Sequence, residues 1–124
     1  MAESRQTTSK VFCMVMLLSG FLHDYKIVQG QKLWCTAKPS ASDVELEANV
    51  NYVCNDQHIN CSIIYEVGAC HFPYTRINHA SVVMNLYYQK MRSHAGDCSF
   101  KNSALLVITD PSYQNCSHEF SQLK

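Results

Sequence analysis

The residues most able to recognise a ligand are concentrated in one segment, NHASVVMNLYYQK, which runs from Asn78 to Lys90. At helical spacing this segment pairs an apolar row with a second row of Asn, His, Tyr and Gln side chains. A tyrosine ring can cover the apolar C–H face of a pyranose, while amide and imidazole groups hydrogen-bond the sugar hydroxyls. The segment is therefore typical of a sugar-binding surface, with an ordinary amphipathic helix as the alternative.

Two adjacent tyrosines, Tyr87 and Tyr88, are central to that choice. They point about 100° apart on a helix, so both cannot face inward equally. We predict that Tyr87 packs inward and that Tyr88 lies on the polar flank. The apolar row consists of Ile77, Ala80, Met84, Tyr87 and Met91, and the other members of the flank are Asn78, His79, Ser81 and Asn85.

No catalytic site is evident among the acidic and histidine side chains. Glycoside hydrolysis needs two carboxyl groups that face each other across a cleft. Glu45 and Glu47 diverge on a helix surface, because residues two apart point in different directions. No short motif pairs the other carboxylates or marks a histidine as a general base. These candidates are Glu66, Asp97, Asp110, His58, His71, His79, His94 and His118. We predict a non-catalytic binding protein with no cofactor and no metal.

The N-terminal segment has the features of a secretory signal peptide. A basic start precedes an apolar run from Val11 to Leu22, which is shorter than the roughly 20 residues of a membrane-spanning helix. We predict that residues 1–30 are removed and that the mature domain spans residues 31–124. A cut after Gly20 and a buried N-terminal helix are the alternatives. Because the C-terminus is polar, we expect a secreted protein without a membrane anchor.

The mature chain would keep an even set of cysteines, which is typical of a disulfide framework in a short secreted domain. A zinc site is the alternative, but no two of them have the C-x2-C spacing. Each bridge would contribute roughly 2–4 kcal/mol by restricting the unfolded state. Spacing alone does not choose among the pairings. The set consists of Cys35, Cys54, Cys61, Cys70, Cys98 and Cys116.

Charge argues against two classes of partner. The chain has 10 Lys and Arg residues and 10 Asp and Glu residues, with no basic stripe. Nucleic acid and anionic membrane surfaces are therefore not expected to bind. We expect a monomer with one domain.

Two helices are predicted around this framework. Val44, Leu46, Ala48 and their neighbours alternate as in a strand, yet SDVE at 42–45 forms a capping box, and Glu, Leu and Ala favour helix. We predict a helix over 43–54. A second helix begins at Thr75 and ends near Gly96, which can take the left-handed conformation that stops helices.

The rest of the chain is predicted to be mostly loop, with one hairpin. Cys54 and Cys61 are close enough to close a small ring. The stretch DCSFKNSALLVITD predicts two short strands around a turn at Lys101 and Asn102. Two sequons, at Asn60 and Asn115, are predicted N-glycosylation sites whose central cysteine restricts access.

Four segments carry a family resemblance: LWCTAKPSASDVELEANVNYVC, INCS, GACHFPYTRINHASVVMNLYYQK and DCSFKNSALLVITDPSYQNC. Together they resemble the plant X8 domain, also called carbohydrate-binding module family 43. The resemblance extends from Trp34 to Cys116 and includes all six cysteines at the family's spacing. The W-C-x-A-K-P, H-A-S, N-x-Y-Y-Q and T-D-P-S-Y signatures are specific.

The resemblance implies a fold, a pairing and a ligand. The implied fold is a small disulfide-rich α+β domain, with two α-helices, a small antiparallel β-sheet, long coil segments and three disulfides. The implied pairs are Cys35–Cys98, Cys54–Cys61 and Cys70–Cys116. Members of the family bind β-1,3-glucan (callose) in plant cell walls. They occur fused to β-1,3-glucanases, as anchored callose-binding proteins, or as small free proteins similar to an olive pollen allergen.

Three departures fall near the predicted site. His71 replaces the usual phenylalanine after the fourth cysteine, Tyr74 replaces an asparagine, and Val82-Val83 replaces Tyr-Ala. One aromatic residue is lost on the helix and another is gained before it. The predicted glucan-binding residues are Tyr74, Asn78, His79, Asn85, Tyr88 and Gln89. A protein-interaction domain on the same scaffold, without sugar binding, is the alternative.

Overall fold

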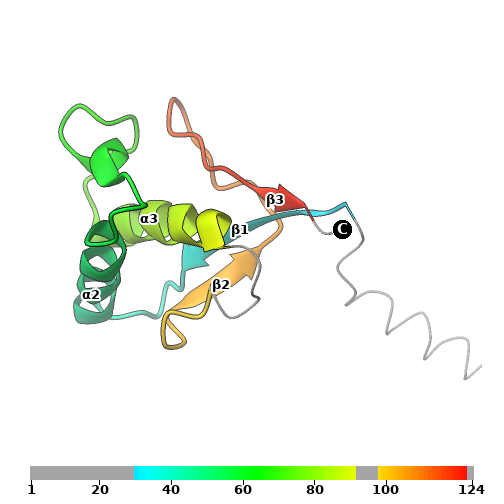
Figure 1. Cartoon of the computed structure of the whole chain (residues 1–124), viewed down its shortest axis with the longest axis horizontal. Coiled ribbons are helices and arrows are strands. Elements are labelled where there is room, and N and C mark those ends of the chain that lie inside the picture. Colours follow the sequence, from blue (N-terminus) through cyan, green and yellow to red (C-terminus); the bar gives the residue numbers. More distant parts are fainter. Residues whose placement is uncertain (1–29, 92–97, 123–124) are drawn as a thin grey trace, which may run out of the picture.

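The computed structural model describes residues 30–91 and 98–122. The elements follow the order β1 (Lys32–Ala37), α2 (Asp43–Cys54), the short 3₁₀ helix η1 (Cys61–Ile64), α3 (Arg76–Met91), β2 (Ala104–Val107) and β3 (Ser121–Gln122). β1 is the central strand of an antiparallel sheet with the order β2-β1-β3. α3 packs against β1 on one side and against α2 on the other (Figure 1). The predicted small α+β fold is confirmed.

The first helix has the predicted bounds and the predicted cap. The Ser42 hydroxyl accepts a hydrogen bond from the Glu45 backbone N–H at 3.2 Å, and the Glu45 carboxylate accepts one from the Ser42 backbone N–H at 2.8 Å. These bonds satisfy backbone groups that a helix start leaves unpaired. The capping box therefore explains why residues 43–54 form a helix, although Val44, Leu46 and Ala48 alternate as in a strand.

The second helix begins one residue after the predicted position. Thr75 Oγ1 accepts a hydrogen bond from the Asn78 backbone N–H at 3.2 Å, which holds the first turn of α3. The end predicted near Gly96 lies outside the described residues, as do residues 1–29 of the predicted signal peptide. In the described part of the chain, no helix has the length and apolar character needed to span a membrane.

All three disulfides implied by the resemblance are present. Cys35–Cys98 joins β1 to the segment before β2, Cys54–Cys61 closes a short loop after α2, and Cys70–Cys116 ties the loop before α3 to the C-terminal segment. The sulfur atoms of these pairs lie within two buried clusters, one on each side of α3. The bridges therefore link long loops covalently to a hydrophobic core that is small for a domain with so much coil.

The predicted hairpin is wrong. Cys98 to Asn102 do not form a strand, and Phe100, Lys101 and Asn102 adopt left-handed backbone angles, with φ of 47°, 53° and 67°. β2 pairs with β1 instead, in a register that places Ala104 opposite Ala37 and Val107 opposite Trp34. β1 and β3, which were not predicted, complete the sheet.

Candidate functional site

An open groove lies between the first half of α2 and the start of α3. Its volume is about 760 Å3. Helix α2 and the loop before it contribute Asp43, Leu46, Glu47, Val50, Pro39 and Ala41. The loop before α3 contributes Tyr74 and Thr75, and the start of α3 contributes Arg76, Ile77 and His79. The groove is therefore apolar at its floor, where Leu46 is buried, and polar at its rim.

Tyr74 provides an exposed aromatic ring in this groove, with 73% of the residue accessible to solvent. The His79 ring meets it edge-on, with centroids 5.3 Å apart and planes at 86°. The His71 ring lies 5.2 Å from it at 51°. Two neighbours thus hold the ring while most of its surface stays in water, which suits stacking on a ligand.

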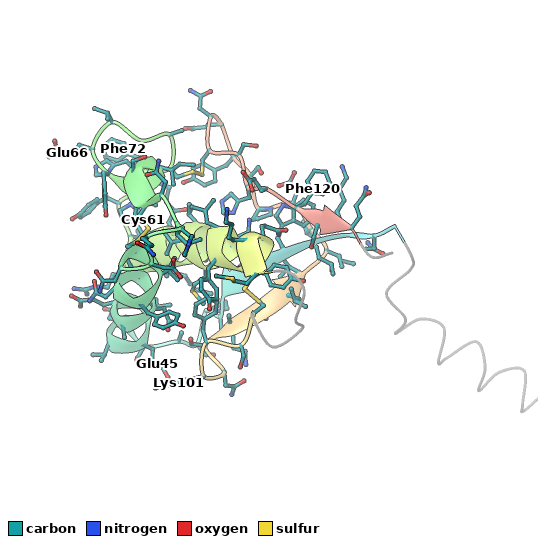
Figure 2. The ribbon with its side chains drawn as sticks, viewed as in Figure 1. Glu45, Cys61, Glu66, Phe72, Lys101 and Phe120 are labelled. Carbon is teal, nitrogen blue, oxygen red and sulfur yellow. A yellow bond between two sulfur atoms is a disulfide. The ribbon has the colours of Figure 1, made fainter. Side chains whose placement is uncertain are left out.

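Asn78 holds the backbone of the loop that carries Tyr74. Its side-chain Nδ2 donates to the carbonyl oxygens of Cys70 at 3.2 Å and Pro73 at 3.1 Å. The Tyr113 hydroxyl lies 3.0 Å from Asn78 Oδ1 and 2.7 Å from the Phe72 carbonyl oxygen. Because these protein groups use the amide of Asn78, this residue positions the loop, and its predicted contact with a ligand is not favoured. Phe72 lies at the same end of the view as Glu66 (Figure 2).

The two histidines beside Tyr74 are each fixed by a main-chain carbonyl. His71 Nδ1 lies 3.0 Å from the Ile64 carbonyl oxygen, and His79 Nε2 lies 2.7 Å from the His71 carbonyl oxygen. The two ring centroids are 5.8 Å apart. Both residues are half-buried, so the imidazoles are rigid parts of the site.

Opposite charges meet across the groove. Arg76 at the start of α3 lies 3.3 Å from Asp43 and 3.8 Å from Glu47, both on α2. All three side chains are largely exposed, so these ion pairs contribute little to stability. They leave carboxylate oxygens and guanidinium N–H groups at the rim, where hydroxyl groups of a ligand could exchange with water.

Three predicted binding residues lie instead in the interior. The exposed fractions are 6% for Tyr88, 1% for Asn85 and 9% for Gln89. Tyr88 packs in the buried cluster with Ala80 and Met84, whereas Tyr87 is only half-buried. The prediction that Tyr87 packs inward and Tyr88 faces outward is therefore wrong.

The amides of Asn85 and Gln89 satisfy backbone groups of β1 and the C-terminal segment. Asn85 Oδ1 accepts from the Cys35 backbone N–H at 2.9 Å, and Asn85 Nδ2 donates to the Glu119 carbonyl at 2.8 Å. Gln89 Nε2 donates to the Leu33 carbonyl at 3.2 Å and to Asn85 Oδ1 at 3.1 Å. Polar side chains on this face of α3 thus hydrogen-bond backbone groups of neighbouring segments, and neither Asn85 nor Gln89 lines the groove between α2 and α3.

Residues 33–105 match the family described as the X8 domain. This chain belongs to the X8 domain family. Among its relatives, the chain is 39% identical over 89 residues to the major pollen allergen Ole e 10 of Olea europaea, a match that covers 72% of each protein.

Two further relatives of this X8 domain are much longer proteins. It is 45% identical over 84 residues to a glucan endo-1,3-beta-D-glucosidase of Olea europaea, covering 68% of this chain and 18% of that protein. It is 36% identical over 91 residues to glucan endo-1,3-beta-glucosidase 4 of Arabidopsis thaliana, covering 73% and 18%. The shared segment is therefore a small part of each of these two proteins.

The sequence-based prediction of this X8 domain's binding site did not include Arg76 or the groove residues that α2 contributes. Asp43 and Glu47 are four residues apart, a spacing that puts both on one face of a helix. Arg76 follows at the start of the next helix. Opposite charges at the starts of two helices were therefore the sequence signal that could have indicated this part of the groove. The sequence did not indicate that the two starts meet, because that contact depends on how α2 and α3 cross.

A second aromatic group of the X8 domain lies outside the groove. Tyr52, which is 63% exposed, meets Tyr87 edge-on with centroids 5.8 Å apart, and Phe100 lies 5.6 Å from Tyr87 on the other side. The two tyrosine hydroxyls are 3.4 Å apart. None of these three residues lines the groove, which makes Tyr52 a matched reference for Tyr74.

Proposed function

We propose that this X8 domain binds β-1,3-glucan in the groove between α2 and α3, without cleaving it. The observation that carries the proposal is the Tyr74 ring, which is 73% exposed and held edge-on by His79. A ring of this kind can cover the C–H face of one glucose unit. The residues proposed to contact glucan are Tyr74 and His79, with Asp43, Glu47 and Arg76 at the rim.

The chemistry of the rim supports a neutral, hydroxyl-rich ligand. The carboxylates of Asp43 and Glu47 accept hydrogen bonds and the Arg76 guanidinium donates them, so both roles of a sugar hydroxyl are matched. Their charges partly cancel through the contacts at 3.3 and 3.8 Å. A strongly charged polymer would gain little from such a surface.

The relatives support the choice of glucan. Two of them are named as enzymes that act on 1,3-β-glucan, and the match covers 18% of each. A segment shared by such enzymes and by a small protein is suited to binding the polymer that the enzymes act on. Catalysis is not proposed, because Asp43 and Glu47 lie on one face of α2 and both contact Arg76, whereas glycoside hydrolysis needs carboxyl groups on opposite sides of the bond.

We also propose that the protein is exported and acts as a monomer in the plant cell wall. Three disulfides support an oxidising compartment, where such bonds persist. Removal of residues 1–30 and glycosylation at Asn60 and Asn115 remain predictions. Both asparagines are exposed, as modification would require.

Affinity electrophoresis tests the proposal. The oxidised domain is run in gels with laminarin, a soluble β-1,3-glucan, and in gels with hydroxyethyl cellulose. We expect retardation by laminarin alone, with Kd of roughly 10 μM to 1 mM, as for an exposed site with one stacked ring. Tyr74→Ala should weaken binding about tenfold.

Tyr52→Ala is the matched control, because Tyr52 is 63% exposed and lies outside the groove. It should leave retardation unchanged. A loss with Tyr52→Ala and not with Tyr74→Ala would move the site to the other aromatic group. A folded domain that laminarin does not retard would favour the protein-interaction alternative, for which Val67 (100% exposed) and Phe72 (70%) offer apolar surface.

A further inference from the structure

We propose that His71 Nε2 and His79 Nδ1 form a subsite that accepts hydrogen bonds from glucan hydroxyl groups beside Tyr74. The proposal rests on the proposed function, since it specifies how the same groove holds its ligand. It adds His71, whose ring lies beside those of Tyr74 and His79 although it does not itself line the groove, and it gives each neutral imidazole a defined tautomer.

The tautomer of each ring follows from its carbonyl partner. A carbonyl oxygen can only accept a hydrogen bond, so the ring nitrogen that faces it must carry the hydrogen. His71 therefore bears its proton on Nδ1, which faces the Ile64 carbonyl at 3.0 Å. His79 bears its proton on Nε2, which faces the His71 carbonyl at 2.7 Å. In the neutral rings, His71 Nε2 and His79 Nδ1 are then acceptors only.

Both acceptor nitrogens are open to a ligand. Neither has a hydrogen-bond partner among residues 30–91 and 98–122. Side-chain atoms of this region that are both buried and unpartnered belong only to Gln89 and His118. The two acceptor nitrogens of His71 and His79, which are half-buried residues, must therefore reach the molecular surface.

The subsite is rigid before any ligand arrives. The His71 ring meets Phe72 edge-on at 4.6 Å and Tyr74 at 5.2 Å, and the His79 ring lies 5.8 Å from His71. Each imidazole is thus held by one carbonyl and by at least two rings. Little side-chain freedom remains to be lost on binding, which favours affinity.

The charged groups around the two rings do not pair with them. Asp43 and Glu47 from α2 and Arg76 from α3 line the same groove as His79, and Arg76 contacts both carboxylates. Glu66 lies in the loop that follows η1. Among the described residues, neither His71 nor His79 forms an ion pair with a carboxylate.

The test measures laminarin affinity by titration calorimetry at neutral pH. EDTA is present throughout, so that adventitious metal cannot occupy the histidines. The proteins are the wild type, His71→Phe, the double variant His71→Phe/His79→Phe and, as a control, His58→Gln. Phenylalanine keeps an aromatic ring against Phe72 and Tyr74, and His58 is an exposed histidine outside the groove.

We expect the double variant to bind laminarin about fivefold more weakly than the wild type, as for the loss of one or two net hydrogen bonds. His71→Phe should lie between them, and His58→Gln should bind like the wild type. Circular dichroism confirms that each protein remains folded.

A folded double variant that binds laminarin as tightly as the wild type would overturn the proposal, as would an equal loss with His58→Gln. Either result leaves the proposed function standing if Tyr74→Ala still weakens binding. If the wild type binds no laminarin, the proposed function fails, and the subsite fails with it.

Discussion

The two halves of α3 carry similar polar side chains and use them in opposite ways. In the first half, His79 lines the open groove, and Asn78 holds the loop that carries Tyr74. In the second half, Asn85 and Gln89 are buried and hold β1 and the C-terminal segment. The role of a polar residue on this helix therefore depends on which backbone lies beside it, and not on its residue type.

The largest effect that separates the two halves should come from the tyrosines. Tyr88→Ala removes a side chain that is 6% exposed from the cluster around Met84. We expect it to lower the free energy of unfolding by about 3–5 kcal/mol, as for other large aromatic residues in cores. Tyr74→Ala, at an exposed position, should change it by less than about 0.5 kcal/mol. Urea unfolding of the oxidised proteins measures both.

The comparison would break if the two variants exchanged these effects. A Tyr88→Ala protein with wild-type stability and no laminarin binding would mean that α3 turns the opposite face to the solvent. A Tyr74→Ala protein that unfolds easily would mean that the ring supports the core.

The next effect concerns the amide that joins β1 to the C-terminal segment. Asn85→Ala removes the acceptor for the Cys35 N–H and the donor to the Glu119 carbonyl. Because these backbone groups lie at a buried position, we expect a loss of about 2–3 kcal/mol of unfolding free energy. Asn51→Ala, at an exposed position of α2, is the matched control and should have no such effect. A small loss for Asn85→Ala would show that water replaces the amide.

Local signals explain what the sequence predicted correctly. The capping box at Ser42 and Glu45 defines the start of α2 within four residues. The cysteine frame, compared with the X8 family, indicated all three bridges. Of the predicted binding residues, Tyr74 and His79 do lie at the groove. Whether they bind glucan remains a prediction.

Long-range contacts explain what the sequence did not predict. β2 was expected to pair with the segment just before it, but its partner is β1, near the start of the domain. The side of α3 that becomes buried is set by that same strand, whose Cys35 N–H needs an acceptor from Asn85. Of the predicted apolar row, Ala80 and Met84 are buried, but Ile77 is exposed and Tyr87 is only half-buried, because helical periodicity does not show where polar backbone lies.

The smallest effect compares the histidines of the two regions. His118, in the segment that Asn85 holds, is buried, and neither of its ring nitrogens has a partner in the described part of the chain. Burial lowers the pKa of His118, and the charge of Asp110 only partly opposes this. The unfolded chain therefore binds a proton at His118 more readily than the folded one. Stability from this group is present above the ordinary imidazole pKa of about 6.5 and is lost as the pH falls below it.

We expect the unfolding free energy to fall between about pH 7 and about pH 5, with a slope from this group of at most about 1.4 kcal/mol per pH unit. Hydrogen bonds from Ser112 to Asp110, and from His58 to Asp56, lower the pKa of these carboxyls, so they titrate below this range. His118→Phe should remove this part of the slope, whereas the double variant at His71 and His79 should keep it, since it leaves His118 and its burial unchanged. Urea unfolding of the wild type and of both variants across this pH range measures the slope of the unfolding free energy. A slope that disappears with His71 and His79 and persists in His118→Phe would place the acid-sensitive support of the fold at the groove.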